Sequence, residues 1–490
     1  MQSLYIDQIR EAMYCIVMMT NWLPDLQQGK GPIYVRLADQ IETAIAGGTL
    51  PAGAKLPPQR NLAYDLGITI GTVSRAYGLV HERGLVNGEV GRGTFVRDTH
   101  DAPPEANLDP VSAALAGTRA ITPPPGKIRF DSTAAPAVGQ DTFLQSHIAA
   151  ILRDHPADIG SYTRSFPDHW FAAGSRWLSK GGWVPEPRNI VPTLGAHAGI
   201  MAVITAVTSP GDKVVFEHLT YSQVSRAAGL AGRRTILVES DAEGVLPEDF
   251  ERVCAQQHPK VAFLMSSAQN PTLATMPLER RQAIVDIARR HNVWLIEDDL
   301  YGAMSPEPLP PLAELGPERT FLVGGLSKSV AAGVRGGWVA CPPHFAQRVR
   351  IAHKMMTGGI PFLLAELCAR LVLSGDAARI RTLCAEEIAA REALACEYLS
   401  GFDFVSHPAV PFLWLALPDP WLSGTFKNAA LTEGVLIDDE DEFKAGRSEK
   451  VLHRARISFS SPQHRDEIRA GFAILRRLLE NGGAGYDSIA

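Results

Sequence analysis

The chain has 490 residues, of which 46% are hydrophobic and 20% are charged. This composition excludes a disordered chain, and the length allows two or three domains, each with its own core. The longest early apolar run, residues 12–19, is too short for a membrane span or a signal core, so we expect no membrane association. Six cysteines without a CxxC pair are typical of reduced thiols in a cytoplasmic protein, and we expect no bound metal.

Positive charge is concentrated near the N-terminus, although the net charge of the chain is −6. Residues 30–97 hold eight Lys or Arg and five Asp or Glu, a local charge of +3, which leaves −9 for the remainder. A cationic end on an acidic body suits contact with phosphates at one place only. Residues 1–29 form an N-terminal extension before this segment, in which Met18 or Met19 is an alternative start.

Residues 30–97 predict a winged helix-turn-helix. Apolar residues at helical spacing predict a first helix over 32–47, and a second short helix follows over 59–66. A third helix is expected over 70–83, with Thr69 as its N-cap. Two short alternating strands, 85–89 and 93–97, surround Gly91-Arg92-Gly93 and complete a hairpin.

The remainder of the chain predicts an α/β domain behind a linker. Residues 98–126 contain six prolines and little periodicity, which is typical of a linker. Residues 127–490 then alternate apolar strands with helices, so we expect a largely parallel sheet, with a smaller α+β lobe over 345–490. The small lobe is expected to hold a long helical stretch, a strand at 412–417, a return strand and a final helix at 465–480. The strands expected in the large sheet are 213–216, 234–238, 261–265, 293–297, 320–323 and 336–340, and the helices are 198–207, 221–230, 247–256 and 277–291.

The third helix of the N-terminal segment is a candidate DNA-reading helix. In a helix-turn-helix the N-terminal residues of the second helix of the pair meet base edges in the major groove. Taken alone, the helix over 70–83 is as easily an ordinary charged surface helix. The glycines beside Arg92 would let that side chain approach the DNA backbone or the minor groove. The residues predicted to contact duplex DNA are Arg60, Thr69, Thr72, Arg75, Arg92 and Gly93.

A second set of motifs lies in the body. An Asn-Pro pair at 270–271 is followed by an Asp with a Tyr three residues later, then by a Ser-Lys pair, and by Arg335 seven residues beyond the lysine. Each motif alone is more often an ordinary structural feature. Together they supply what pyridoxal phosphate needs, namely an amine, a carboxylate for the pyridine nitrogen, donors to the 3′-oxygen and a cation for the phosphate. The motifs in this order therefore predict a pyridoxal phosphate site.

The individual roles follow from the chemistry of the cofactor. Lys328 is the predicted catalytic amine, Asp298 holds the pyridine nitrogen, and Tyr221 stacks on the ring. Tyr301 and Asn270 are the predicted partners of the 3′-oxygen. The segment Gly195–Gly199 opens a helix and should cradle the phosphate at the helix N-terminus. Arg456 is predicted to hold the α-carboxylate of a substrate or effector by a bidentate contact. The residues predicted to bind the cofactor are Gly195, Ala196, His197, Tyr221, Asn270, Asp298, Tyr301, Ser327, Lys328 and Arg335.

Both parts of the chain resemble known families. Residues 53–60, 65–77 and 91–96 resemble the GntR-type winged helix, and the body from residue 127 resembles fold-type I, class I/II aminotransferases. Their fusion through a Pro-bearing linker resembles the MocR subfamily of transcriptional regulators, as do residues 21–26 and 174–178. The resemblance implies a pyridoxal phosphate-binding homodimer, in which the DNA module of one chain lies against the body of the other.

Several positions depart from the pattern of these families. An Arg is usual at position 70, and Ser or Thr are usual at 196 and 325. Losing two hydroxyl donors to the phosphate removes about 1.5–3 kcal/mol each, so binding is expected to be weaker by one to a few powers of ten but retained. Tyr162 would match a phosphate-contacting Tyr from the neighbouring subunit. The residues at the departing positions are Ile70, Ser165 and Trp170 (for Gly and Arg), Ala196, Leu273 (for Gly) and Gly325.

Three functions compete on these observations. The first is a transcription factor in which a small amino compound, reacting at the cofactor aldimine, modulates binding to a double-stranded operator. The second is an aminotransferase of amino acids with an accessory DNA-binding module. The third is a repressor whose body is only a dimerisation scaffold. The DNA module favours the first over a plain enzyme, and Lys328 and Asp298 argue against the third. Residual transamination is compatible with the first.

Overall fold

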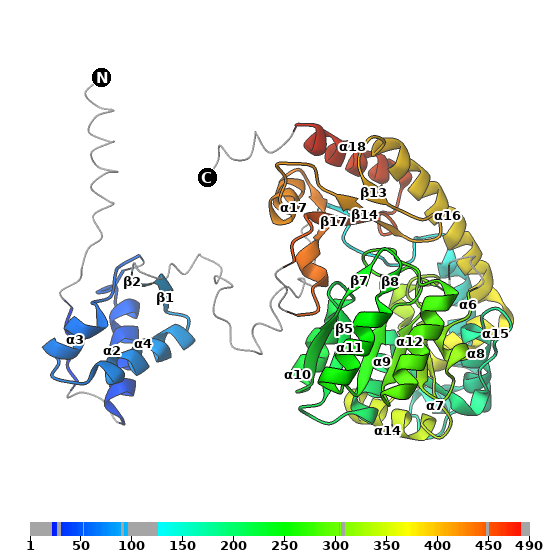
Figure 1. Ribbon diagram of the computed structural model, residues 1–490, viewed down its shortest axis with the longest axis horizontal. Helices are drawn as coiled ribbons and strands as arrows, with labels where there is room; N and C mark the ends of the chain where they lie inside the picture. The colour runs from blue at the N-terminus through cyan, green and yellow to red at the C-terminus, as the bar shows by residue number, and fades with distance from the viewer. Residues whose placement is uncertain are drawn as a thin grey trace. The chain divides into compact units, whose positions relative to one another are not determined.

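The computed structural model describes residues 22–26, 31–51, 53–89, 93–96, 126–302, 304, 309–446 and 450–481. The chain divides into two compact units, Met1–Asp109 and Pro110–Ala490. In Figure 1 the first unit is coloured blue and the second runs from cyan to red. The predicted extension before residue 22, Arg92 at the hairpin tip and the linker up to residue 125 lie outside the described residues. Within the described ranges, no helix has the length and apolar character needed to cross a membrane.

Three helices and a hairpin form the first unit, which confirms the winged helix-turn-helix expected from the sequence. Leu37, Leu62 and Val73 are fully buried where the three helices meet. The hairpin strands pair antiparallel, with Val86 opposite Val96. The elements are α2 (Ile33–Ala46), α3 (Gln59–Asp65), α4 (Ile70–Glu82), β1 (Val86–Glu89) and β2 (Gly93–Val96).

The turn between α3 and α4 is built by local chemistry. Gly67 has a φ of +61°, a left-handed conformation that glycine adopts without strain. The Thr69 hydroxyl accepts a hydrogen bond from the Thr72 backbone N–H at 3.2 Å, so Thr69 is the predicted N-cap of α4. The Tyr77 hydroxyl donates to the Pro57 carbonyl at 2.7 Å. The start of α4 is therefore fixed relative to the segment that precedes α3.

A seven-stranded sheet forms the centre of the second unit. All six predicted strands belong to it, and only β12 runs antiparallel to its neighbours, so the largely parallel sheet is confirmed. A seventh strand, β4, was not predicted because Pro192 argues against a strand, and β4 lies at the sheet edge where Pro is tolerated. In spatial order the strands are β4 (Ile190–Thr193), β12 (Gly337–Ala340), β11 (Thr320–Gly325), β10 (Trp294–Asp298), β9 (Val261–Leu264), β5 (Lys213–Glu217) and β6 (Arg234–Val238).

Helices cover this sheet, and four of them were predicted. Among these, α9 begins at Gly195, three residues before the expected start, so the glycine of the predicted phosphate cradle is its first residue. The predicted helices are α9 (Gly195–Val207), α10 (Ser222–Leu230), α11 (Pro247–Gln257) and α12 (Leu278–Arg290). The others before residue 345 are α6 (Gln140–Asp154), α7 (Pro156–Ile159), α8 (Asp168–Leu178) and α13 (Leu312–Leu315), with short turns η2 (Pro187–Asn189) and η3 (Ala332–Val334) and a small hairpin β7 (Ser240–Asp241) and β8 (Gly244–Val245).

The chain after residue 345 contributes to both parts of the body. The long helical stretch is three helices, of which α14 packs against α9, and α15 packs against α8 and α6 of the large lobe. The third, α16, lies beside the final helix α18 (Figure 1). These helices are α14 (Ala346–Thr357), α15 (Phe362–Ser374), α16 (Asp376–Tyr398) and α18 (Arg465–Asn481).

A small antiparallel sheet in the order β13-β14-β17-β16 forms the second lobe. It includes the predicted strand at 412–417 and its return strand, which is β17. The segment that follows the linker, β3 (Ile128–Arg129), pairs in parallel with β15 (Val435–Leu436), a contact that the sequence did not predict. The elements are β13 (Phe404–Val405), β14 (Phe412–Ala416), α17 (Ser423–Thr432), β16 (Asp438–Asp439), η4 (Glu440–Phe443) and β17 (Arg454–Ser458).

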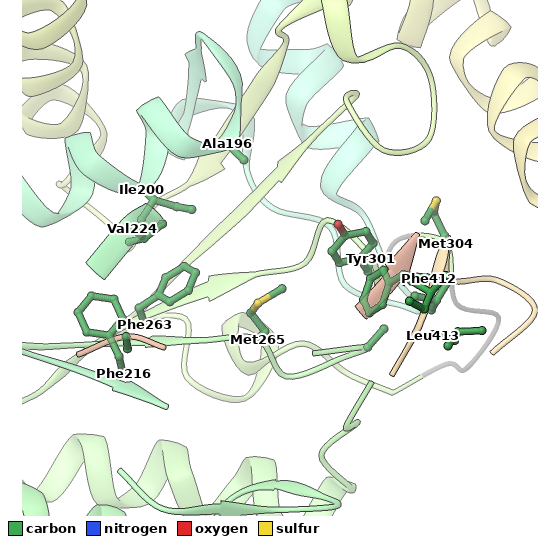
Figure 2. Close-up of a cluster of buried hydrophobic side chains, with 14 of the residues drawn as sticks. Ala196, Ile200, Phe216, Val224, Phe263, Met265, Tyr301, Met304, Phe412 and Leu413 are labelled. Atoms are coloured by element: carbon green, nitrogen blue, oxygen red, sulfur yellow. The ribbon is translucent and has the colours of Figure 1, made fainter. Parts of the chain in front are cut away.

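One apolar core connects the two sheets of the body. Figure 2 shows part of this core, with Phe216 of β5 beside Phe263 of β9, and Tyr301 beside Phe412 of β14. The ring centroids of the first pair are 5.9 Å apart and those of the second pair are 5.2 Å apart. Because this core is continuous, it holds the large and small lobes of the body in a fixed position relative to each other.

Candidate functional site

A cavity of about 310 Å³ lies in the body, and elements of both sheets contribute to its wall. This volume is in the range of small-molecule and cofactor sites. The structure brings together at this cavity every residue that the sequence predicted for cofactor binding, and Arg456 as well. These residues come from segments separated by as much as 261 positions, namely Gly195, Ala196, His197, Tyr221, Asn270, Asp298, Tyr301, Ser327, Lys328, Arg335 and Arg456.

Lys328 is held in place by a threonine that the sequence did not single out. Its Nζ donates to the Thr133 hydroxyl at 2.8 Å, and the Tyr301 hydroxyl donates to the same oxygen at 2.8 Å. Tyr301 is buried against Phe412, which fixes its ring. Thr133 therefore joins the amine to the phenol predicted to face the 3′-oxygen of the cofactor.

The three consecutive acidic residues at the end of β10, Glu297 to Asp299, have different surroundings. Glu297 is directed away from the cavity, where its carboxylate accepts hydrogen bonds from the backbone N–H groups of Leu312 and Ala313 at 3.0 and 3.2 Å. Asp299 forms an ion pair with Lys180 at 3.1 Å. Only Asp298 of the three lines the cavity. Strand alternation and the turn after β10 thus leave one carboxylate for a ligand.

Asp298 is poised to pair with a cation. Its side chain is buried, and burial raises the pKa of Asp298 to about 7. The Leu300 backbone N–H donates to it at 3.2 Å, and the charge of Lys328 acts in the opposite direction by favouring the carboxylate. A protonated pyridine nitrogen at this position would favour the ionised form strongly, because the environment has a low dielectric.

The N-terminus of α9 forms the other end of the cavity. Gly195 has a φ of +80°, and the first N–H groups of a helix have no partner inside the helix, so they are directed at whatever occupies this space. Arg335 lines the same region, and it too has a left-handed backbone, with a φ of +52°. This arrangement fits a dianionic phosphate. Burial and the charge of Arg335 lower the pKa of His197, so this residue is a neutral imidazole there.

Tyr221 lies next to the phosphate end of the cavity, with its ring 5.9 Å from that of His197 in an edge-on arrangement. Burial raises the pKa of Tyr221 to about 12, so its phenol stays neutral at physiological pH. The His197 Nδ1 atom is buried and has no hydrogen-bond partner within the described part of the chain. Such an atom is a polar group that a ligand or water would satisfy.

Arg456 is already engaged in this structure. One of its terminal nitrogens donates to the Asn270 side-chain oxygen at 2.8 Å, and the other pairs with Asp438 at 2.5 Å. Its guanidinium lies over the Phe443 ring at 4.6 Å and the Phe412 ring at 5.4 Å. The predicted carboxylate clamp is thus located at the cavity, but both terminal nitrogens have protein partners.

The structure shows the surroundings of three departing positions and of Tyr162. A Cβ at Gly325 would lie 2.9 Å from the Gly336 carbonyl oxygen, so this backbone excludes a Ser or Thr there. Leu273 has a φ of +62°, the conformation for which Gly is usual. Trp170 is a core residue whose indole N–H donates to Glu366 at 2.7 Å. Tyr162 is 88% exposed and does not line the cavity of its own chain.

Several cavity residues carry no signal in the sequence. Thr133 follows β3 in a stretch without a motif, and Asp131, two positions earlier, forms an ion pair with Arg129 at 2.9 Å. Glu442 reaches the cavity from η4. The run of five acidic residues from 438 to 442 was visible in the sequence. Its relation to the cavity depends on the β16–β17 pairing and could not be predicted.

The residues predicted to read DNA lie on the surface of the first unit. Arg60, Thr69 and Arg75 are exposed, and the Thr69 and Thr72 hydroxyls are 2.9 Å apart, so both take part in the cap. Gly93 begins β2 opposite Glu89, and Arg92 lies outside the described residues. Their contacts with DNA remain predictions.

The other cations of this unit divide into two groups. Arg83 pairs with Asp39 at 2.7 Å and with Glu42 at 2.6 Å, and Arg36 donates to the Leu26 carbonyl at 2.7 Å. Arg60 and Arg75, in contrast, make no hydrogen bond or ion pair with any residue that the structure describes. Among these four arginines, the two that can contact phosphates therefore lie on α3 and α4, whereas the charge of Arg83 is neutralised by carboxylates of its own unit.

Known proteins resemble this chain in both parts. Residues 176–464, more than half of the chain, match the family of class I and II aminotransferases, and residues 33–96 match the gntR family of bacterial regulatory proteins. The uncharacterized HTH-type transcriptional regulator YdeF of Bacillus subtilis is 29% identical over 464 residues, covering 94% of this chain and 97% of that protein. The HTH-type pyridoxine biosynthesis transcriptional regulator PdxR of Corynebacterium glutamicum is 27% identical over 319 residues, covering 63% and 66%.

The fold of the body is also found in solved structures. LysN, an alpha-aminoadipate aminotransferase from Thermus thermophilus, aligns with a TM-score of 0.65 at 22% sequence identity, covering 76% of this chain and 95% of that one. That crystal structure holds N-(5′-phosphopyridoxyl)-L-leucine. At this identity the likeness establishes the fold alone, and it agrees with the fold-type I architecture expected from the sequence.

Proposed function

The chain belongs to the family of class I and II aminotransferases, and from this premise we propose that it is a transcriptional regulator whose body binds pyridoxal phosphate and senses an amino compound. It combines this body with a GntR-type winged helix, as MocR-type regulators do. The observation that carries the proposal is that Lys328 and Asp298 line one cavity in a chain that also contains a DNA-binding module.

The residues at the cavity fit pyridoxal phosphate. Asp298 would hold the pyridine nitrogen, and the N-terminus of α9 with Arg335 and Ser327 would hold the phosphate. When bound, the cofactor supplies an aldehyde that reacts with amines and a ring that withdraws electrons. The unpartnered Nδ1 of His197 and the left-handed Gly195 support this fit, because they are polar or open positions at the phosphate end.

The protein's own groups prepare Lys328 for its role. The Thr133 hydroxyl accepts from Lys328 and fixes the direction of the amine, and Tyr301 donates to the same oxygen. With the cofactor bound, an effector amine would compete with Lys328 for the aldehyde, and a displaced Lys328 would be able to make other contacts. Such an effector shifts DNA affinity only by its differential binding to two arrangements of the protein, typically about 1–3 kcal/mol. A homodimer is part of this proposal, because the exposed Tyr162 is then available to the neighbouring subunit. As a DNA-binding regulator, the protein is expected to act in the cytoplasm.

The test compares the full-length protein with Lys328→Ala. We expect a visible absorption band in the wild type after addition of pyridoxal phosphate, and its loss in Lys328→Ala. Lys354→Ala, which changes an exposed lysine of α14, is the matched control and should keep the band. Amines that change the band should also change affinity for the duplex upstream of the protein's own gene. A protein that stays colourless with excess cofactor refutes the proposal.

An aminotransferase with an accessory DNA module is the second candidate. The complete set of Lys328, Asp298, Tyr301 and Asn270 at one cavity favours it, because a pure sensor needs no electron sink. Multiple turnovers with an amino donor and a keto acceptor, without any change in operator affinity, would establish this alternative.

A further inference from the structure

Five consecutive acidic residues, Asp438 to Glu442, lie beside the cofactor cavity. Two of them bear on the chemistry of the ligand. Asp438 is on β16, directly opposite Arg456 of β17 in the strand register, and Glu442 lines the cavity. Asp441, in contrast, is directed outwards, with a side chain that is 66% exposed, and it pairs with Lys444 at 2.6 Å.

Asp438 occupies the guanidinium that a ligand carboxylate would need. The side chain of Asp438 is 1% exposed and that of Arg456 is 7% exposed, and the two form an ion pair at 2.5 Å. Arg456 cannot turn away readily, because it lies over both Phe443 and Phe412 and donates to Asn270. The pair is therefore a preformed, buried neutral unit rather than an open cation.

The charges at the cavity leave little for a second anion. Its lining has five cationic side chains, Arg129, Arg226, Lys328, Arg335 and Arg456, and three carboxylates, Asp131, Asp298 and Glu442. The difference is two positive charges. The phosphate dianion of the cofactor would offset both, and a protonated pyridine nitrogen beside Asp298 would add one positive charge back. Asp438, behind Arg456, adds one more negative charge. Glu442 and Asp439 are bridged by Lys427 at 3.0 and 3.2 Å, which holds the acidic segment against the cavity.

We propose that this site selects amino compounds that lack an α-carboxylate, and that Asp438 is the residue that excludes the carboxylate by occupying Arg456. A carboxylate entering next to Asp438 would be a like charge in a buried environment, and the guanidinium beside it, Arg456, is already paired. This inference rests on the proposed function, since it names the class of effector. It replaces the expectation that Arg456 is a clamp for an α-carboxylate.

The test uses two stable ligands that differ only in the carboxylate. N-(5′-phosphopyridoxyl)-L-leucine and N-(5′-phosphopyridoxyl)-isopentylamine share the phosphate, the ring and the side chain. Calorimetric titration into the cofactor-free, full-length protein measures their affinities without any reaction. We expect the wild type to bind the amine compound at least about tenfold more tightly than the leucine compound.

Substitution at the acidic segment then identifies the cause. In Asp438→Asn, which keeps the shape of the side chain, the preference for the amine compound should fall at least about tenfold, because Arg456 gains an uncompensated charge. Asp441→Asn removes the same charge from the same segment, but outside the cavity, and should keep the wild-type ratio. A wild type that binds the leucine compound equally or more tightly overturns the inference, and this measurement needs no variant.

The outcomes separate the inference from the function on which it rests. If neither ligand binds the wild type, the cofactor site itself is wrong and both proposals fail. If both bind and change operator affinity, but the ratio of affinities is the same in the wild type and in a folded Asp438→Asn, the protein is a sensor and Asp438 does not set its selectivity.

Discussion

Restoring a hydroxyl at position 196 should tighten cofactor binding. Ala196 is the second residue of α9, lines the cavity at its phosphate end and is 5% exposed. In Ala196→Ser the new hydroxyl would join the backbone N–H groups of the helix N-terminus as a donor to the phosphate. A hydrogen bond to a charged group contributes about 1.5–3 kcal/mol, so we expect affinity for pyridoxal phosphate to rise about 10- to 150-fold.

A serine at position 325, the second position where a hydroxyl residue is usual in these families, should not tighten cofactor binding and should destabilise the protein. A Cβ at Gly325 would lie 2.9 Å from the Gly336 carbonyl oxygen and 3.4 Å from a Leu300 methyl. That carbonyl accepts the Leu326 backbone N–H at 3.0 Å, so Gly325→Ser forces apart β11 and β12 instead of adding a donor. We expect a loss of stability of about 1–3 kcal/mol, which is the usual cost of overpacking, and no gain in cofactor affinity.

Equilibrium titration of the cofactor-free proteins with pyridoxal phosphate, together with thermal denaturation, measures both effects. Val207→Thr is the matched control, because it adds a hydroxyl at the last residue of the same helix, which does not line the cavity. An unchanged dissociation constant in Ala196→Ser would show that the helix N-terminus does not hold the phosphate. A Gly325→Ser protein as stable as the wild type would contradict the packing argument.

Three further changes test the site and the DNA module. Burial raises the pKa of Asp298 to about 7, so its protonated form stabilises the cofactor-free fold below pH 4 and this contribution is lost as pH rises to about 7. Asp298→Asn should therefore be more stable than the wild type at pH 8, by at most about 4 kcal/mol in thermal melts, yet bind pyridoxal phosphate more weakly. Arg75→Ala should cost about 1–3 kcal/mol of operator affinity if it reads a base, whereas Arg83→Ala, whose charge is spent on Asp39 and Glu42, should change affinity little. Equal losses in the two variants would contradict this assignment. Ile70→Arg adds a cation at the exposed start of α4 and should steepen the salt dependence of binding to any duplex, and an unchanged slope would place this position away from the DNA.

The sequence predicted those parts of the molecule that local chemistry determines. Short-range patterns predicted the cap at Thr69 and the six strands of the large sheet. The motifs between Asn270 and Arg335 were also recognisable from short stretches of sequence. Strand ends of a parallel sheet meet at one edge, so motifs at the ends of β10 and β11 were expected near each other. The strand β4, which contains Pro192, was not predicted, and α9 begins at Gly195, the residue expected to open the helix, although its apolar stretch was placed from 198.

The rest of the site depends on pairing between distant segments. Arg456 was recognised as a cation near the cavity, but its partner Asp438 is a neighbour only through the antiparallel register of β16 and β17. No pattern in the sequence distinguishes Asp438 from Asp441, three positions later in the same acidic run, although Asp438 is buried against Arg456 and Asp441 is exposed to solvent. The sequence therefore showed that this segment is acidic, but not that Asp438 is the residue that pairs with Arg456.

The segment from residue 126 to 135 connects the end of the linker to the cavity. Its first part pairs with β15 of the small lobe, and the Ala135 backbone N–H donates to the Ser327 carbonyl at 3.3 Å. Between these contacts, Thr133 accepts hydrogen bonds from Lys328 and Tyr301. We expect a ligand that engages the Lys328 amine to break or rearrange its hydrogen bond to Thr133. The chain that leads from the linker into the body is therefore part of the wall of the site, so we expect occupancy of the cavity to change the contacts of this segment.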